Sequence, residues 1–322
     1  MTLALPDKWL WDFWTAEDRG RLHVFYLQAD RALLDPDLRH WNVSIGHAVS
    51  DDLDAWEVLP PAFAPAPRPA WDDKSTWTGS VIRTGDTWAM LYTGTSHAED
   101  GLVQRVGLAT SADLVHWDRH PGPVLEADPR WYELLDLDAW FDQAWRDPWV
   151  FRGPDGAFHA YVTARAAEGP ARGRAVIGHA RSDDLVRWEV LPPVTRPMGF
   201  GQMEVPQLLK AGGRWYLLFS SDPGTRLPEC GAEGVGTYAL SADDPLGPFE
   251  PETLHAVDAG PPASSAPGEH APYAGKVVPF NGALHFLGWE GVDGGGAFRG
   301  TLARPRAVTV TPDGRLAVGG EG

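Results

Sequence analysis

The sequence predicts an all-β fold, a five-bladed β-propeller of four-stranded antiparallel blades around a central funnel, and three observations support this prediction. The chain contains 36 glycines and 29 prolines among 322 residues, which leaves little room for long helices. A turn motif recurs along the chain at intervals of 59 to 71 residues. Short apolar segments lie between its copies, and strands at such regular intervals are typical of propeller blades.

The repeated motif is Ser-x-Asp-Leu followed by an aromatic residue. It begins at Ser50, Ser111 and Ser182, and a degraded fourth copy begins at Ser241, with Phe249 in the position of the Trp. Ser and Asp side chains accept hydrogen bonds from nearby backbone N–H groups and so close a turn. The Leu and Trp side chains then fasten the turn to the core, so we expect a structural role for these residues.

Strand-like segments precede the motif and also lie between its copies. Those before the motif are small and apolar, at 45–49, 106–110, 176–180 and 237–240. Those between copies are rich in aromatic residues and bounded by Gly, Asp or Pro, at 22–27, 88–92, 157–162, 214–219 and 283–288. Five repeats account for the whole length, so we expect one catalytic domain over residues 1–322. A short helix is expected within 128–145, and a final strand after Ala303 is expected to close the ring.

Composition and charge exclude several classes of partner and site. The formal net charge of −17 argues against nucleic acid and anionic membranes, because cationic side chains drive phosphate binding. No run of 18 apolar residues occurs, so no transmembrane helix is expected. The single cysteine, Cys230, excludes a disulfide framework and a Cys-based zinc site.

The sequence also lacks the motifs that are typical of metal sites, cofactor sites and secretion signals. There is no His-Glu-x-x-His run and no phosphate-cradling glycine loop, so neither a metal nor a cofactor is expected. The first 14 residues show no basic segment followed by an apolar stretch, which predicts a cytoplasmic location. The sequence carries no signal for the oligomeric state.

Unusual residues recur one repeat apart. They are Asp12, Trp77, Asp147, Glu204 and His270. Because a propeller gathers the innermost strand of every blade around one axis, residues at equivalent positions converge in space. Carboxylates in apolar surroundings are rare without a partner, so we expect the three carboxylates to share one acidic site. The alternative is that they cap strands or pair with cations.

Three carboxylates in an aromatic-lined funnel indicate glycoside chemistry. One attacks or stabilises the anomeric carbon, and a second protonates the departing oxygen. The third accepts hydrogen bonds from sugar hydroxyls and favours an oxocarbenium-like transition state. Arg146 would hold sugar oxygens or orient a carboxylate. The 16 Trp residues offer flat faces for sugar rings.

At these residues the sequence resembles the five-bladed-propeller glycosidases of glycoside hydrolase family 32, with levansucrases of family 68 and arabinofuranosidase-type enzymes of family 43 as neighbours. The resemblance covers about residues 9–290. It rests on segments that follow one another in the order of the family: 11–14, 40–41, 46–56, 77–80, 91–94, 141–151 and 204–206. The segment around Asp12 reads Trp-Asp-Phe-Trp, which is closer to the levansucrases.

The resemblance implies a role for each carboxylate. It implies Asp12 as nucleophile, Asp147 as transition-state stabiliser and Glu204 as general acid/base. The sugar contacts that it implies are Arg146, Trp77 and Ser80. Four further sugar contacts are expected because they lie beside these motifs or recur with the repeat: Trp11, Gln28, Trp41 and His270. The β-sandwich that usually follows the propeller in family 32 is not expected.

The expected activity is retaining hydrolysis of a β-fructofuranoside or similar furanoside, such as sucrose or a short oligosaccharide. Retention predicts a separation of about 5 Å between the carboxyl groups of Asp12 and Glu204. A separation of about 8 Å would instead favour an inverting, family-43-like arabinofuranosidase or xylosidase. A fructosyl transferase would pass through the same glycosyl-enzyme. A non-catalytic carbohydrate-binding propeller remains the alternative of another class, and its signature would be a missing carboxylate.

Overall fold

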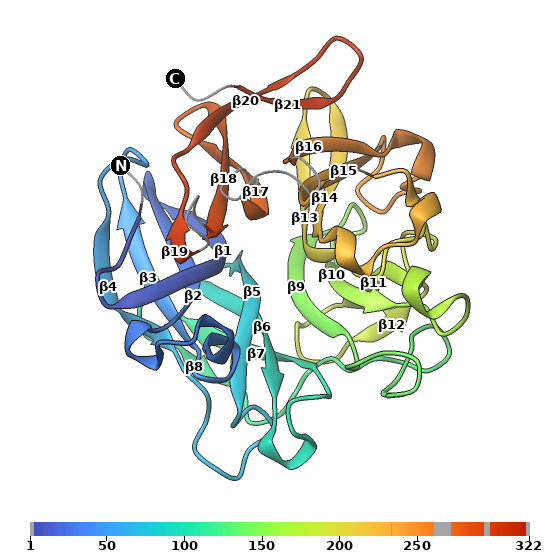
Figure 1. The fold of residues 1–322 in the computed structure, drawn as a ribbon. Coiled ribbons are helices and arrows are strands. Elements are labelled where there is room, and N and C mark those ends of the chain that lie inside the picture. The colour runs from blue at the N-terminus through green and yellow to red at the C-terminus, as the bar shows by residue number, and fades with distance from the viewer. Residues whose placement is uncertain (1–2, 233, 261–271, 293–296, 320–322) are drawn as a thin grey trace.

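The protein folds into a ring of five antiparallel sheets (Figure 1), as a computed structural model that describes residues 3–232, 234–260, 272–292 and 297–319. Its regular secondary structure is almost entirely β. The predicted five-bladed β-propeller is therefore confirmed. The helices in the described ranges are short 3-10 turns, and none is long and apolar enough to cross a membrane.

Each blade is built from strands that follow one another along the chain. The first blade comprises β1 (Lys8–Asp18), β2 (Arg21–Asp30), β3 (Ser44–Ser50) and β4 (Glu57–Phe63). The second comprises β5 (Ser75–Thr84), β6 (Thr87–Thr95), β7 (Arg105–Ser111) and β8 (Asp118–Arg119). The third comprises β9 (Trp145–Arg152), β10 (Phe158–Arg165), β11 (Ala175–Ser182) and β12 (Glu189–Leu191). The fourth comprises β13 (Glu204–Ala211), β14 (Arg214–Ser221), β15 (Gly236–Ala242) and β16 (His255–Ala259).

The fifth blade departs from this simple order and closes the ring. It comprises β17 (Tyr273–Phe280), β18 (Ala283–Val292), β20 (Arg306–Val310) and β21 (Leu316–Val318), with β19 (Phe298–Leu302) paired to β18. The strand expected after Ala303 is present as β20, but β20 and β21 form the outer edge of the fifth blade, so the expectation that this strand closes the ring is wrong. Closure comes instead from β1, which packs against β17, β18 and β19, and from a bridge between Leu3 and Leu302.

The repeated turns have the structure that the sequence predicts. Ser50, Ser111 and Ser182 each accept a hydrogen bond from the backbone N–H of the Leu three residues later, at 2.8, 2.8 and 2.9 Å. In each turn, the Asp that lies between the Ser and the Leu accepts hydrogen bonds from two further backbone N–H groups. The three Leu residues adopt positive φ and are buried. These residues are therefore structural.

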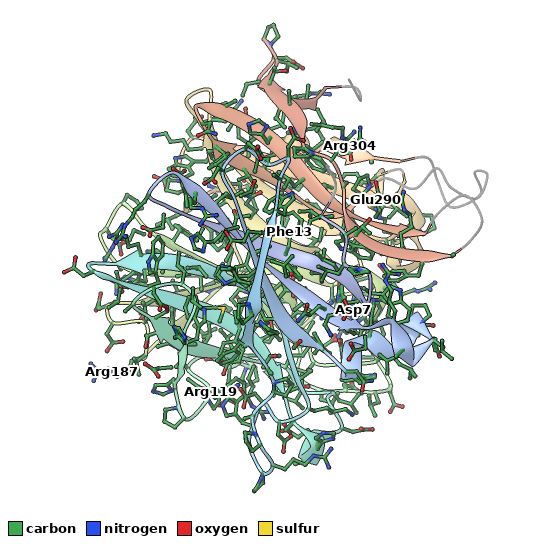
Figure 2. The ribbon with its side chains drawn as sticks, turned by 90° about the vertical axis from the view of Figure 1, so that its left-hand side faces the viewer. Asp7, Phe13, Arg119, Arg187, Glu290 and Arg304 are labelled. Atoms are coloured by element: carbon green, nitrogen blue, oxygen red, sulfur yellow. The ribbon has the colours of Figure 1, made fainter. Side chains whose placement is uncertain are left out.

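The hydrophobic core lies between neighbouring blades. Trp14 of the first blade packs in one cluster with Met90 of the second, and further clusters join the second blade to the third, the third to the fourth, the fourth to the fifth and the fifth to the first. Figure 2 shows Phe13 in the interior and Arg187 at the outer surface. Because every blade is buried on both faces by its neighbours, the ring behaves as one packed unit.

The short helix expected within 128–145 does not form. The segment consists of turns and irregular backbone. Its turns are closed by the Asp128 and Asp136 carbonyls, and its far end is tied to the second blade because Gln143 N–H donates to the Leu102 carbonyl at 2.8 Å. These local turns and tertiary backbone hydrogen bonds replace the regular ladder of a helix.

We expect Ser182→Ala to lower the free energy of unfolding by about 1 kcal/mol, because the substitution leaves the Asp184 and Leu185 N–H groups without their acceptor. Chemical denaturation measures this change. Asp183→Ala, at an exposed position in the same turn, is the control and should stay within about 0.5 kcal/mol of the wild type. Equal effects of the two substitutions would contradict the structural role of the repeated serine.

Candidate active site

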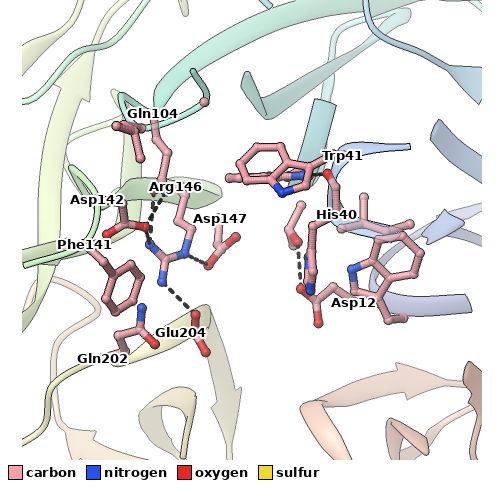
Figure 3. A pocket seen from close by; sticks show the side chains of 16 residues that line it. Asp12, His40, Trp41, Gln104, Phe141, Asp142, Arg146, Asp147, Gln202 and Glu204 are labelled. Atoms are coloured by element: carbon pink, nitrogen blue, oxygen red, sulfur yellow. Dashed lines mark hydrogen bonds and ion pairs between the residues drawn. The ribbon is translucent and has the colours of Figure 1, made fainter. Parts of the chain in front are cut away.

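A pocket of about 380 Å³ lies where the innermost strands meet at the axis of the ring (Figure 3). Four of these strands, β1, β5, β9 and β13, contribute side chains to it. The rest of its lining comes from three connecting segments, 40–41, 101–104 and 141–142, together with Leu27 and Gln202. The site is therefore assembled from parts of the chain that are distant in sequence.

A β-bulge lies at the pocket end of every innermost strand. The register of pairing shifts between Trp11 and Phe13 in β1, between Trp77 and Gly79 in β5, and at equivalent points of β9, β13 and β17. A bulge leaves one residue unpaired and redirects its side chain. Asp12, Thr78 and Asp147 are such residues, and Glu204 and Tyr273 directly precede the bulges of β13 and β17.

The bulges impose unusual backbone conformations. Asp147, Val205 and Ala274 have φ values of 55°, 53° and 49°, a region that non-glycine residues rarely adopt. A Cβ atom on Gly79 would lie 2.1 Å from the Leu91 carbonyl oxygen, so only glycine fits the bulge of β5. Such strain persists where the surrounding structure holds it and is typical of functional sites.

Asp12 lies at the base of the pocket with both carboxylate oxygens held. Trp289 Nε1 donates to Oδ1 at 2.8 Å, and Thr78 Oγ1 donates to Oδ2 at 3.2 Å. Burial, together with the negative charges of Asp147 and Glu204, raises the pKa of Asp12 to about 7. The two donors favour the ionised form but do not cancel these effects.

Asp147 is fixed more tightly than Asp12. Its backbone N–H donates to Thr93 Oγ1 at 2.8 Å, while its Oδ2 accepts from Thr163 Oγ1 at 2.8 Å and from the Val205 N–H at 3.2 Å. Burial raises the pKa of Asp147, although Arg146 opposes the shift. Because Val205 follows Glu204, this hydrogen bond ties the Asp147 carboxylate of the third blade to the backbone next to Glu204 in the fourth.

Glu204 is held by two donors from different blades. Arg146 Nη2 donates to its Oε1 at 2.7 Å, and the Tyr273 hydroxyl donates to its Oε2 at 2.5 Å. Both contacts fix the orientation of the carboxyl group, as required of a group that transfers a proton to one particular atom. Burial and the adjacent Glu204 raise the pKa of Tyr273 well above its usual range, so the phenol stays protonated as a donor.

Arg146 contacts most of the carboxylates of the pocket. Its Nη1 lies 3.4 Å from Asp142 Oδ2, its Nη2 contacts Glu204, and its Nε lies 3.6 Å from Asp147 Oδ2. Burial alone would lower the pKa of the guanidinium, but Glu204, Asp142 and Asp147 raise it. Arg146 therefore stays charged and fully occupied by protein groups.

Several residues singled out in the sequence meet in this pocket. Those that line it are Asp12, Asp147, Glu204, Trp11, Trp41, Trp77 and Arg146. Trp11 Nε1 is buried and has no hydrogen-bond partner among the described residues.

Of three further residues that were expected to contact the sugar, two are described by the structure and are not found in the lining of the pocket. Ser80 does not line the pocket, because its hydroxyl donates to the Pro148 carbonyl at 2.6 Å and accepts from the Val150 N–H at 2.8 Å. Gln28 is also outside the lining, and its amide donates to Ser44 Oγ at 3.2 Å. Both residues are buried and connect strands, which corrects the expectation for them. His270 lies outside the described residues.

Several polar residues at the site are not among those expected from the sequence. Tyr273 lies 69 residues after Glu204, so the period itself could have located it in the fifth repeat. Thr78 lies 66 residues after Asp12, so the period could have located it in the second repeat as well. Gln104, Asp142 and Trp289 carried no such signal. Another missed residue, Lys276, is buried below the pocket, where its Nζ donates to the Val205 carbonyl at 3.0 Å; burial lowers its pKa to about 8.

No group of three or more His, Cys, Asp or Glu side chains in the described ranges is arranged to hold a metal ion. The pocket carboxylates are instead held by Arg146, Tyr273, Thr78, Thr163 and Trp289. What the arrangement offers chemically is four carboxyl groups around one cavity, those of Asp12, Asp142, Asp147 and Glu204. Two of them, Asp12 and Glu204, approach it from different sides (Figure 3).

Comparison with known proteins identifies similar sequences and folds. The glycosyl hydrolases family 32 N-terminal domain matches residues 14–228, well over half of the chain. The extracellular sucrase of Zymomonas mobilis subsp. mobilis is 26% identical over 314 residues, covering 83% of this chain and 74% of that protein. The sucrose-6-phosphate hydrolase of the same organism is 28% identical over 213 residues, covering 63% of this chain and 38% of that protein.

A solved structure shares the fold over nearly the whole chain. The inulosucrase from Halalkalicoccus jeotgali bound to kestose superposes with a TM-score of 0.78 at 23% identity, covering 98% of this chain and 87% of that one. At this level of identity the similarity shows the fold alone.

The raised pKa of Asp12 predicts a pH-dependent effect on stability. Its pKa is about 7 in the folded protein and about 3.9 in an unfolded chain. The ionised form therefore destabilises the fold increasingly as the pH rises from about 4 to 7, by a few kcal/mol in all. We expect Asp12→Asn to raise the Tm at pH 8 and to change it little at pH 4, as measured by thermal unfolding.

The control is Asp138→Asn, which removes an exposed carboxylate of the segment beside the pocket. It should leave the Tm nearly unchanged at both pH values. An equal shift by Asp12→Asn at pH 4 and pH 8 would contradict a buried, high-pKa carboxyl group at this position.

Proposed function

The chain belongs to glycosyl hydrolase family 32, and from that membership and the pocket geometry we propose that it hydrolyses the β-fructofuranosidic bond of sucrose-type substrates with retention of configuration. The observation that carries this proposal is the set of three carboxylates, Asp12, Asp147 and Glu204, around one pocket. The names of the relatives support the substrate, since they include a sucrase and a sucrose-6-phosphate hydrolase.

In the first step, Asp12 acts as the nucleophile. Its carboxylate oxygen forms a bond to the anomeric carbon while the bond from that carbon to the bridging oxygen breaks. Glu204 donates its proton to the bridging oxygen, which leaves with the bonding electron pair as the hydroxyl of the departing sugar. Trp289 and Thr78 hold the attacking carboxylate in place throughout.

In the second step, Glu204 accepts a proton from water. The resulting oxygen nucleophile attacks the anomeric carbon, and Asp12 departs as a carboxylate. Two displacements at the same carbon restore the original configuration. Asp147 stabilises the positive charge that develops on the ring in both transition states, and its rigid hydrogen bonds avoid reorganisation during the reaction.

The cytoplasmic location expected from the sequence remains a prediction. One relative carries the name of an extracellular sucrase, so the two locations are alternatives. Fractionation of cells that produce the native protein, with sucrose cleavage assayed in each fraction, tests this point.

We expect Glu204→Gln to lower kcat/KM for sucrose by about 10²- to 10⁴-fold, because the amide cannot donate a proton to the leaving oxygen. Glucose release in a coupled assay measures the change. The control is Glu189→Gln, an exposed Glu on β12, which should keep the wild-type rate. Wild-type activity of Glu204→Gln would show that another group is the acid.

The stereochemistry of the product separates the retaining mechanism from the inverting one. We expect β-fructofuranose as the first anomer detected by NMR during sucrose cleavage, because two displacements occur at the same carbon. The α-anomer as first product would contradict the role of Asp12 as nucleophile. Products longer than the substrate at high sucrose concentration would show transfer to a sugar acceptor.

A further inference from the structure

A fourth carboxylate, that of Asp142, lines the pocket and is not used by the mechanism above. Its Oδ2 accepts from Gln104 Nε2 at 2.7 Å and lies 3.4 Å from Arg146 Nη1. Its Oδ1 is buried and has no hydrogen-bond partner in the part of the chain that the structure describes. The negative charge of Asp142 is therefore only partly compensated, which is unusual for a side chain in this setting.

Asp142 lies on the side of the pocket where the leaving group departs. Glu204 protonates the leaving oxygen, so the leaving group must lie beside it. Arg146 contacts Glu204 through Nη2 and Asp142 through Nη1, which places the two carboxylates on the same guanidinium. Figure 3 shows these three residues together on one side and Asp12 on the other.

The charges around the leaving group are strongly unbalanced. Four carboxylates line the pocket, and Arg146 is the only Lys or Arg among the described lining residues. All three nitrogens of Arg146 already face Asp142, Asp147 or Glu204. His40 also lines the pocket, but burial and the nearby Arg39 and Arg146 lower its pKa to about 3, so it is neutral.

The other cations near the pocket are engaged elsewhere. Lys74 pairs with Asp100, and Lys276 donates to the Val205 carbonyl. Arg39 Nη1 donates to the Pro36 carbonyl, while its Nε is buried without a hydrogen-bond partner among the described residues. A phosphate group is normally bound by free Arg or Lys donors. None of these three cations is among the described residues that line the pocket.

The mouth of the pocket instead suits an uncharged ring. Trp41 and Phe141 both line the pocket and are 42% and 55% exposed. Flat aromatic faces pack against the apolar face of a sugar ring and offer nothing to an anion.

We propose that the pocket selects an uncharged saccharide as leaving group and excludes one that carries a phosphate, and that Asp142 is the specificity-determining residue that supplies the excluding charge. This inference rests on the proposed function and narrows its substrate class. Similarity does not decide between the two classes, because the relatives include enzymes named for each of them. Repulsion between like charges at close range is strong enough to reject the wrong substrate.

The test compares kcat/KM for sucrose and for sucrose 6-phosphate, whose phosphate is on the glucose leaving group. We expect the wild type to prefer sucrose by at least about 100-fold. We expect Asp142→Asn to reduce this preference by at least about tenfold, because the variant removes one negative charge and frees part of the Arg146 charge. Asp138→Asn, with the same change of charge at an exposed position, should keep the wild-type preference.

Each contrary outcome overturns a distinct statement. A wild type that cleaves both substrates equally overturns the inference and leaves the proposed function intact. If Asp142→Asn lowers both values of kcat/KM in the same proportion, Asp142 only orients Arg146 and its assigned role is wrong. A wild type that cleaves neither substrate overturns the proposed function and the inference together. Inhibition of the wild type by glucose but not by glucose 6-phosphate gives a second measurement that needs no variant.

Discussion

The arrangement of the pocket depends on one buried cation, the Arg146 guanidinium. Without it, Asp142, Asp147 and Glu204 would share a desolvated space with uncompensated like charges, which is among the most unfavourable arrangements in a protein interior. With it, the carboxylates of two neighbouring blades are held at defined positions. The balance is incomplete. Burial raises the pKa of Asp12, and the remaining negative charge of the pocket raises it further and underlies the inferred selectivity.

The ring gives this electrostatic arrangement its rigidity. Every innermost strand carries a bulge at the same level, so each blade directs one side chain out of its regular alternation and toward the axis. The strained backbone at Asp147 and Val205 is tolerated because the sheets on either side are fully packed. Stability is thus supplied by the outer strands and the interfaces between blades, while the site itself is a source of strain and charge repulsion.

The residues that could be predicted from the sequence are those whose signal is local or periodic. The Ser-x-Asp-Leu turns were recognised because a turn is closed by side chains within three residues. Asp12, Asp147 and Glu204 were recognised because they recur with the blade. Tyr273 follows the same period, and so does His270, three residues earlier, so the spacing alone does not distinguish between them. Ser80 and Gln28 were misassigned because nothing local shows which way a buried polar side chain faces.

The all-β repeat, the number of blades and the positions of Asp12, Asp147 and Glu204 could be predicted from the sequence, because turn chemistry is local and the repeat recurs along the chain. How these positions form one site depends on tertiary contacts. The partners of the carboxylates come from other blades, as when Trp289 of the fifth blade donates to Asp12 of the first. Such contacts form only when the ring closes. The burial of the carboxylates and the interactions between their charges therefore cannot be read from the order of residues along the chain.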